Sequence, residues 1–253
     1  MVLFRPLLFS PDARKYRSRS GIREYLQAKG IFGVLMKRIL LAVLLIVGFA
    51  TTLHAEPDRG LCAYIRGDYD AAFNVWQPAA TEGDSVAQYR LGLLYFDGKG
   101  VAQSSDVAVV WLRKSAEQGH VIAQYRLGLI YYVGQGLPVD YFEAAKWFRL
   151  AAEQGHAKAQ YQLGLMHTLG RGVPLDRVEA SGWYRRSADQ DVTSAQLALA
   201  RMLEDGEGET RNDARALYWY RRAAERGNST AARKSDEISA RMNGERRPRP
   251  SSK

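Results

Sequence analysis

The chain has little of the material from which disulfide frameworks and metal sites are built. Its 253 residues include one cysteine, Cys62, and four histidines. One thiol cannot form an internal disulfide and cannot supply a multi-thiolate zinc site. No cluster of histidine, aspartate and glutamate has metal-ligand spacing. The sequence therefore predicts no metal and no cofactor, and Cys62 is expected to be a small buried apolar residue.

The main part of the chain also lacks an excess of charge of one sign. The formal net charge is +9, but residues 1–55 hold nine of the 36 basic residues and two of the 27 acidic ones. The remainder is left with 27 bases and 25 acids. A nucleic-acid-binding domain carries its basic excess on the folded part. The sequence therefore argues against a nucleic-acid partner.

Recognisable catalytic groupings are missing as well. No nucleophile has a visible set of partner residues, and the serines fall mostly in turns, caps or the tail, where they suit backbone hydrogen bonds. The recurring Gly-x-Gly segments lack the preceding strand and the wider fingerprint of a phosphate loop. The sequence predicts no catalytic residue and a protein that is not an enzyme.

A hydrophobic run near the amino end predicts export. Met36, Lys37 and Arg38 precede twelve mostly apolar residues, 39–50, and Ala55 stands at a plausible cleavage point. This pattern is typical of a secretory signal peptide over residues 36–55, and translation from Met36 would make residues 1–35 an upstream extension.

An uncleaved inner-membrane anchor is the alternative, because residues 39–55 are seventeen uncharged residues, which is short for a membrane span. Positive residues stay on the cytoplasmic side in either case. We therefore expect the rest of the chain outside the cytoplasm, either periplasmic or secreted, or anchored to the inner membrane.

A period of 36 residues dominates the sequence downstream of this segment. The pattern Gln-Tyr-x-Leu-Gly starts at Gln88, Gln124 and Gln160, with a weaker copy at Gln196. Tryptophan keeps the same spacing at Trp111, Trp147, Trp183 and Trp219, and Trp76 precedes them by 35. Gly-x-Gly starts at Gly98, Gly134, Gly170 and Gly206. A fixed period in this range is typical of a solenoid.

Each period predicts two helices, A and B, separated by the Gly-x-Gly turn. The first helix A is expected near residues 84–97, and glycine in the turn is free to adopt positive φ. Helix B is predicted to begin after a capping residue, namely Ser104, Asp140, Asp176 or Asn212. Glu143 and Glu179 complete two predicted capping boxes. Helix B is predicted to end at Gly83, Gly119, Gly155 and Gly227, with Asp191 as the exception.

Small residues recur in the middle of helix A, where glycine costs about 1 kcal/mol relative to alanine. They are Gly92, Gly128, Gly164 and Ala200. This repeated cost predicts a close approach of helix A to helix B. The matching small surface on helix B is predicted to be Ala116, Ala152, Ala188 and Ala224.

The periodic aromatic and histidine residues are predicted to be structural. The tryptophans are expected to pack in the core rather than to form a ligand cage. His120 and His156 stand one period apart in the same turn, which favours a role in the turn over a ligand pair. His167 is expected to be packed or partly exposed on helix A.

These motifs resemble the Sel-1-like repeat, a relative of the tetratricopeptide repeat. The resemblance is carried by the V-A-Q-Y-R-L-G segment at 86–92, the G-K-G-V turn at 98–101 and the A-A-K-W-F-R-L-A-A-E-Q-G segment at 144–155. It implies an all-α fold, an α/α right-handed solenoid of helix pairs.

The predicted organisation follows from the repeat. After the extension 1–35 and the signal or anchor 36–55 come N-terminal capping helices at 56–83, four repeats at 84–227, a capping helix at 228–243 and a disordered basic tail at 244–253.

Helix A positions that differ between copies are the candidates for recognition. One such stripe supplies the predicted ligand-binding residues Val86, Arg90, Ile122, Arg126, Lys158 and Gln162. Its other members are Leu93, Asp97, Leu129, Val133, Leu165 and Leu169. The mixture of cationic, amide and aliphatic side chains could hold a peptide or a helix of a partner. A merely solvated face is the alternative.

The resemblance implies a non-enzymatic scaffold that binds a protein or peptide partner. Recognition of envelope polysaccharide or peptidoglycan is the alternative. A cysteine-rich branch of related repeat proteins is associated with β-lactam binding or hydrolysis. That activity is less favoured here because the branch uses paired cysteines, and this chain has Cys62 alone. The sequence does not indicate an oligomeric state.

Overall fold

The computed structural model describes residues 58–245, and every regular element in that range is an α-helix. The helices are α3 (Arg59–Ile65), α4 (Tyr69–Glu82), α5 (Ser85–Asp97), α6 (Ser105–Glu117), α7 (Val121–Val133), α8 (Tyr141–Glu153), α9 (Ala157–Leu169), α10 (Arg177–Asp189), α11 (Thr193–Asp205), α12 (Asp213–Glu225) and α13 (Ser229–Glu245). The predictions for residues 1–35 and 36–55, and for the tail after Glu245, lie outside the described residues.

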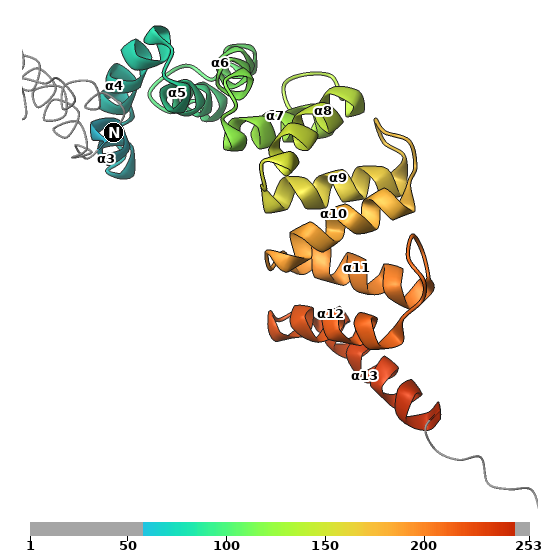
Figure 1. Ribbon diagram of the computed structural model, residues 1–253. Helices are drawn as coiled ribbons and strands as arrows, with labels where there is room; N and C mark the ends of the chain where they lie inside the picture. Colours follow the sequence, from blue (N-terminus) through green and yellow to red (C-terminus); the bar gives the residue numbers. More distant parts are fainter. Residues whose placement is uncertain (1–57, 246–253) are drawn as a thin grey trace, which may run out of the picture. The chain divides into compact units, whose positions relative to one another are not determined.

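The helices pack in chain order, each against the next (Figure 1). Helices α5, α7, α9 and α11 are the four helices A, and α6, α8, α10 and α12 are the four helices B. Helix α4 precedes them in the position of a helix B, and α13 follows them in the position of a helix A. This arrangement confirms the predicted all-α solenoid of helix pairs.

Side-chain caps start each helix B, as predicted. Ser104, Asp140, Asp176 and Asn212 are the N-cap residues of α6, α8, α10 and α12, and each side chain accepts a hydrogen bond from a backbone N–H two or three residues on. Such a cap contributes about 1 kcal/mol to the stability of a helix.

The capping boxes predicted at Glu143 and Glu179 are wrong. The Glu143 carboxylate accepts a hydrogen bond from the indole Nε1 of Trp147 at 3.1 Å, and Glu179 accepts one from Trp183 at 2.9 Å. The backbone N–H of Asp140, which a box would use, donates to the Tyr131 carbonyl instead. Each glutamate therefore accepts a hydrogen bond from a buried indole N–H. The backbone N–H of the N-cap residue does not need the glutamate, because it already donates to a carbonyl of the preceding helix A.

The Gly-x-Gly turns adopt the positive φ angles that the sequence predicts, between 65° and 80° at all eight glycines. The second glycine of a turn lies against the first residue of the preceding helix B. A Cβ atom at Gly172 would overlap the backbone of Tyr141, and one at Gly208 would overlap the carbonyl of Arg177. This glycine therefore sets how closely adjacent repeats stack.

A residue with positive φ, in the left-handed backbone conformation, also follows each helix B, as predicted. Gly83, Gly119, Gly155 and Gly227 have φ between 84° and 106°. Asp191, in the equivalent place, is the one non-glycine residue among the described ones with positive φ, at 66°. Its carboxylate accepts ion pairs from Arg222 at 2.6 Å and Arg226 at 2.7 Å.

The glycines in the middle of helix A allow the predicted close approach of helix B. A Cβ atom at Gly128 would lie 2.6 Å from the ring of Phe148, and one at Gly92 would lie 2.9 Å from Leu112 and 3.2 Å from the Ala108 carbonyl oxygen. The prediction that Ala116, Ala152, Ala188 and Ala224 provide the facing surface is wrong. A large side chain about one turn earlier fills that space.

The alanines at the end of helix B have a different role, in a glutamine ladder that links successive repeats. The Gln124 amide donates to the Ala116 carbonyl at 3.0 Å, and its Oε1 accepts a hydrogen bond from Gln154 at 2.8 Å. Gln88 and Gln160 make the same pair of bonds. Buried polar groups are tolerated when they are paired in this way.

The periodic indoles lie in the core, as predicted, with one partial exception. Trp76, Trp147, Trp183 and Trp219 are buried. Trp111 is half-buried and packs against the buried apolar residues of α3, α4 and α5, which include Leu91. Basic side chains lie over all five rings, including Lys114 over Trp111 at 4.4 Å.

The prediction that Cys62 is buried is wrong, because its side chain is exposed. Helix α3 turns Gly60 and Ala63 toward α4, and the buried Gly60 lies directly on the ring of Trp76. Cys62 falls on the other side of this short helix. Cys62 is exposed because α3 is the first of the described helices and no described helix precedes it to cover that side.

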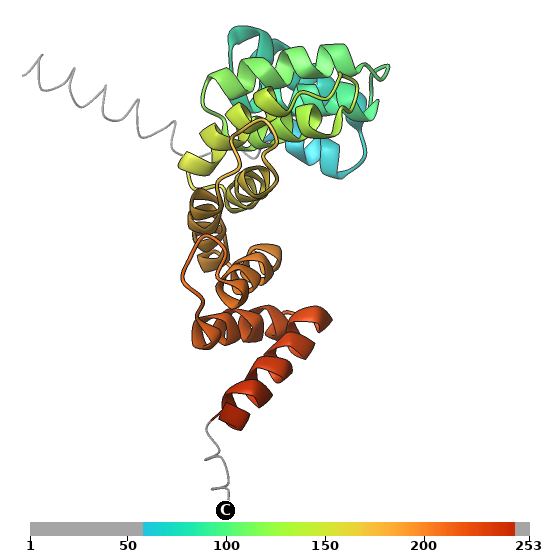
Figure 2. The same ribbon diagram turned by 90° about the vertical axis from the view of Figure 1, so that its right-hand side faces the viewer.

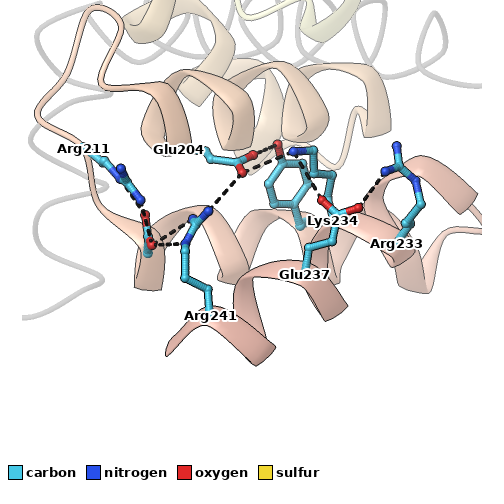
Figure 3. A network of polar contacts seen from close by, with 8 residues as sticks. Glu204, Arg211, Arg233, Lys234, Glu237 and Arg241 are labelled. Carbon is cyan, nitrogen blue, oxygen red and sulfur yellow. Dashed lines mark hydrogen bonds and ion pairs between the residues drawn. The ribbon is translucent and has the colours of Figure 1, made fainter. Parts of the chain in front are cut away.

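At the other end, α13 packs against α12 (Figure 2) and forms ion pairs with residues of α11 and α12 (Figure 3). Ala231 and Ile238 are its fully buried apolar anchors. Figure 3 shows Glu204 of α11 between Lys234 and Arg241, with nitrogen–oxygen distances of 3.2 and 3.7 Å. A polar outer helix of this kind is typical of the terminal unit of a repeat array.

Candidate protein-binding face

The twelve predicted stripe residues share one face of helices A, and none of them is fully buried. In α7, Ala123, Leu127 and Ile130 are buried in the core, and Gly128 faces Phe148 of α8. The remaining face carries residues 122, 126, 129 and 133. The same register holds in α5 and α9, and we call these twelve residues the outer stripe.

Aliphatic side chains of the outer stripe are exposed to solvent. The exposed fractions are 40% for Val86, 50% for Ile122, 63% for Val133 and 47% for Leu169. Leu93, Leu129 and Leu165 are half-buried between them. Single exposed aliphatic residues are ordinary, but a row of them over three successive helices makes this face the candidate recognition surface.

The two arginines of the outer stripe lie over aromatic rings of the preceding elements. The Arg90 guanidinium lies 5.3 Å from the centre of the Trp76 ring, and Arg126 lies 5.8 Å from the Phe96 ring. Burial lowers the pKa of Arg90 from its ordinary value. These contacts hold the cationic groups in place on the surface.

In α9, Lys158 is exposed and Gln162 is half-buried. The Oε1 atom of Gln162 is buried and has no hydrogen-bond partner among the described residues. All six predicted ligand-binding residues thus lie on one type of face, on three successive helices A.

The apolar part of the outer stripe ends at α11. The equivalent positions there are Ser194, Ala198, Arg201 and Asp205. An arginine replaces the central leucine, and an aspartate replaces the exposed aliphatic residue at the end of the helix. The apolar row is therefore confined to α5, α7 and α9.

Histidine rings border the outer stripe where helices A begin. The Nδ1 atom of His120 accepts a hydrogen bond from the Ala123 backbone N–H at 3.2 Å, and that of His156 accepts one from Ala159 at 3.1 Å. The rings pack on Tyr89 and Tyr125, with centroid distances of 5.0 and 4.4 Å. Both histidines are N-caps, which confirms and sharpens the predicted role in the turn.

His167 is buried, in agreement with the expectation of a packed histidine. Its ring lies within hydrogen-bond distance of Arg149 of α8 and of the Pro174 carbonyl.

Acidification is expected to weaken the two histidine caps, because a protonated Nδ1 cannot accept a hydrogen bond. Burial lowers the pKa of both histidines. The charge of Arg90 lowers the pKa of His120 further, whereas Asp84 raises it, and the charge of Lys158 lowers the pKa of His156 further. Below about pH 6.5 the unfolded chain then binds more protons than the folded one. We expect these two caps to leave the free energy of unfolding unchanged above that pH. Below it, the free energy of unfolding should fall by about 1 kcal/mol for each cap that is lost.

Thermal unfolding of the full chain at pH 7.5 and 5.5 measures this effect. The variant His120→Asp/His156→Asp is the control, because Asp84 caps α5 in the equivalent place and accepts from Ala87 at 2.6 Å. The variant should lose most of the difference in Tm between the two pH values. An unchanged difference would show that other groups cause it.

A second exposed apolar patch lies near the starts of helices B and was not predicted. It consists of Val139, Phe142, Leu175 and Val178, and Phe142 is 71% exposed. The turn at Gly172 lies directly on the start of α8, which brings the loop before α10 beside Phe142. The sequence signal was available, because Val139 and Leu175, and Phe142 and Val178, are each 36 residues apart.

An open groove of about 540 Å³ lies along α6 and includes Val110, Arg113 and Leu137. Arg113 donates a hydrogen bond to the Tyr131 hydroxyl within it. The groove contains no residue of the outer stripe, so it is a separate surface feature.

Two further features of the described range bear on function. Within residues 58–245 no group of three or more histidine, cysteine, aspartate or glutamate residues could hold a metal ion. No helix of the same range combines the length and apolar character required to cross a bilayer.

Tandem helix pairs with a 36-residue period and an exposed face on helices A define an α/α solenoid repeat protein. The model of the Sel1 repeat matches residues 85–120, 121–156, 157–192 and 193–228, so the chain belongs to the Sel1 repeat family. Proteins of this family are scaffolds that generally serve protein–protein interaction.

Solved structures show the same fold. A protective antigen of uropathogenic Escherichia coli strains, described as displaying an SLR fold, is 38% identical with a TM-score of 0.64 over 68% of this chain. A Sel1 repeat protein from Oxalobacter formigenes is 32% identical with a TM-score of 0.62 over 67% of this chain. The match spans 38% and 49% of those two chains. The comparison with curated proteins found no match.

Proposed function

We propose that this protein is an exported, non-enzymatic scaffold of the bacterial envelope that binds a protein or peptide partner along the outer stripe. The observation that carries the proposal is the row of exposed aliphatic side chains over α5, α7 and α9. Membership of a family of interaction scaffolds supports it. Export rests on the basic and apolar pattern of residues 36–55.

Recognition by this face fits a segment of chain better than a small molecule. Small-molecule sites are concave and enclose most of their ligand. The outer stripe instead distributes its contacts over three successive helices. None of its twelve positions is aromatic, so the structure adds no support for the polysaccharide alternative.

Capture from envelope extracts tests the proposal. The full chain with a C-terminal affinity tag is expressed in a bacterial host, the cells are fractionated, and proteins that co-purify from the envelope fraction are identified. We expect the double variant Arg90→Glu/Arg126→Glu to lose the partner at least about tenfold, since two favourable contacts become repulsive.

The matched control is Phe142→Ser/Val178→Ser, which changes two exposed residues on helices B, away from the outer stripe. This control should retain the partner. Unchanged recovery with the stripe variant, or loss with the control alone, would remove the outer stripe as the binding face. A tagged chain found only in the cytoplasm would contradict export.

A further inference from the structure

The charge of the outer stripe is one-sided. Arg90, Arg126 and Lys158 are its basic residues, and Asp97 is its one acidic residue. The Asp97 carboxylate already forms an ion pair with Lys99 at 3.3 Å. The stripe therefore carries net positive charge beside its aliphatic side chains, although the part of the chain after residue 55 is nearly neutral.

Arg126 lies where two repeats meet. Its guanidinium on α7 lies 5.8 Å from the centre of the Phe96 ring on α5. This contact places a fixed cation between the exposed aliphatic residues of the two helices.

A guanidinium suits a carboxylate, because it only donates hydrogen bonds and keeps its charge at neutral pH. Arg90 occupies the equivalent place one repeat earlier, and Lys158 carries a flexible cation on α9. A partner that supplies carboxylates at intervals along an aliphatic segment would match all three elements.

Resting on the proposed function, we propose that the outer stripe binds an acidic segment rich in aliphatic side chains. Its carboxylates lie beside Arg90, Arg126 and Lys158. Its aliphatic side chains cover Ile122, Val133 and the other exposed aliphatic residues of the stripe. The polar positions of α11 mark the end of this contact.

Three synthetic peptides of equal length test the partner's chemistry. They share the same leucine positions and carry glutamate, serine or lysine at every other position. Binding to the full chain is measured by fluorescence anisotropy at 50 and 500 mM NaCl. We expect the glutamate peptide to bind about tenfold more tightly than the serine peptide at low salt, and the difference to shrink at high salt.

Charge reversal at one position identifies the subsite. Arg126→Glu should abolish the preference for the glutamate peptide, because it reverses the charge of the cation held over Phe96. Lys146→Glu makes the same change of charge on α8, where the lysine pairs with Glu143 away from the stripe, and should leave the preference intact.

Equal binding of the three peptides, or a preference that survives in Arg126→Glu, would overturn the acidic partner. If the glutamate and serine peptides bind equally and Val133→Asp abolishes both, the stripe binds a partner but not an acidic one. If none of the three peptides binds and envelope capture is also indifferent to the stripe variants, the proposed function fails together with this inference.

Discussion

Replacing Gly172 by alanine is expected to lower the free energy of unfolding by about 4 kcal/mol. Two costs add at this position. The backbone has φ of 67°, which an alanine rarely adopts, and the new Cβ would overlap the carbonyl of Tyr141. Backbone atoms cannot move aside as a flexible side chain can, so the steric cost adds to the conformational one.

Gly119→Ala separates these two costs. Gly119 has φ of 85°, but no atom lies within 4 Å of the position that its Cβ would occupy. We expect it to lose only about 1 to 2 kcal/mol, from the backbone conformation alone. Urea unfolding followed by circular dichroism measures both variants. Equal losses would mean that the stacking of repeats does not depend on the contact at Gly172.

Phe148→Ala is expected to destabilise the protein by about 3 to 5 kcal/mol, the usual cost of removing a buried phenylalanine. Phe148 is fully buried and fills the space that Gly128 leaves open on α7. Its ring also packs against Tyr125 and Tyr132, at centroid distances of 5.8 and 6.3 Å. The truncation therefore opens a cavity between the two helices of one repeat.

Phe142→Ala on the same helix is the matched control. Phe142 is exposed at the start of α8, so the change removes the same atoms from water instead of from the core. It should alter stability by no more than about 0.5 kcal/mol. A large loss from Phe142→Ala, or a small one from Phe148→Ala, would show that the two faces of α8 have been assigned the wrong way round.

The sequence predicted correctly the features that depend on one residue and the backbone within a few residues of it. The caps of helices B follow from side chains that accept from the next turn, and the turns follow from glycines that adopt positive φ. The outer stripe was predicted for a related reason. The other faces of helices A carry the repeated motif residues, and a period of 3.6 leaves one face for the positions that vary.

The sequence predicted wrongly the contacts that depend on how two helices are rotated relative to each other. It also predicted wrongly the exposure of a residue whose helix lies at the end of the described stack. The choice of Ala116 over the residues around Leu112 as the surface facing Gly92 is an error of about one helical turn. Glu143 fits the spacing of a capping box, but Trp147 competes for it within the core. Cys62 is exposed because α3 is the first helix of the described stack.

By itself, the sequence determined the number of repeats, the start and end of their helices and the face of helices A that stays exposed. These properties depend on local geometry and on a repeated pattern. The tertiary structure alone decided which side chains meet between helices: the ring of Phe148 at Gly128, the glutamine ladder, and Arg126 over Phe96. Such contacts depend on how packed helices are rotated and spaced relative to one another, and the 36-residue sequence pattern does not specify this.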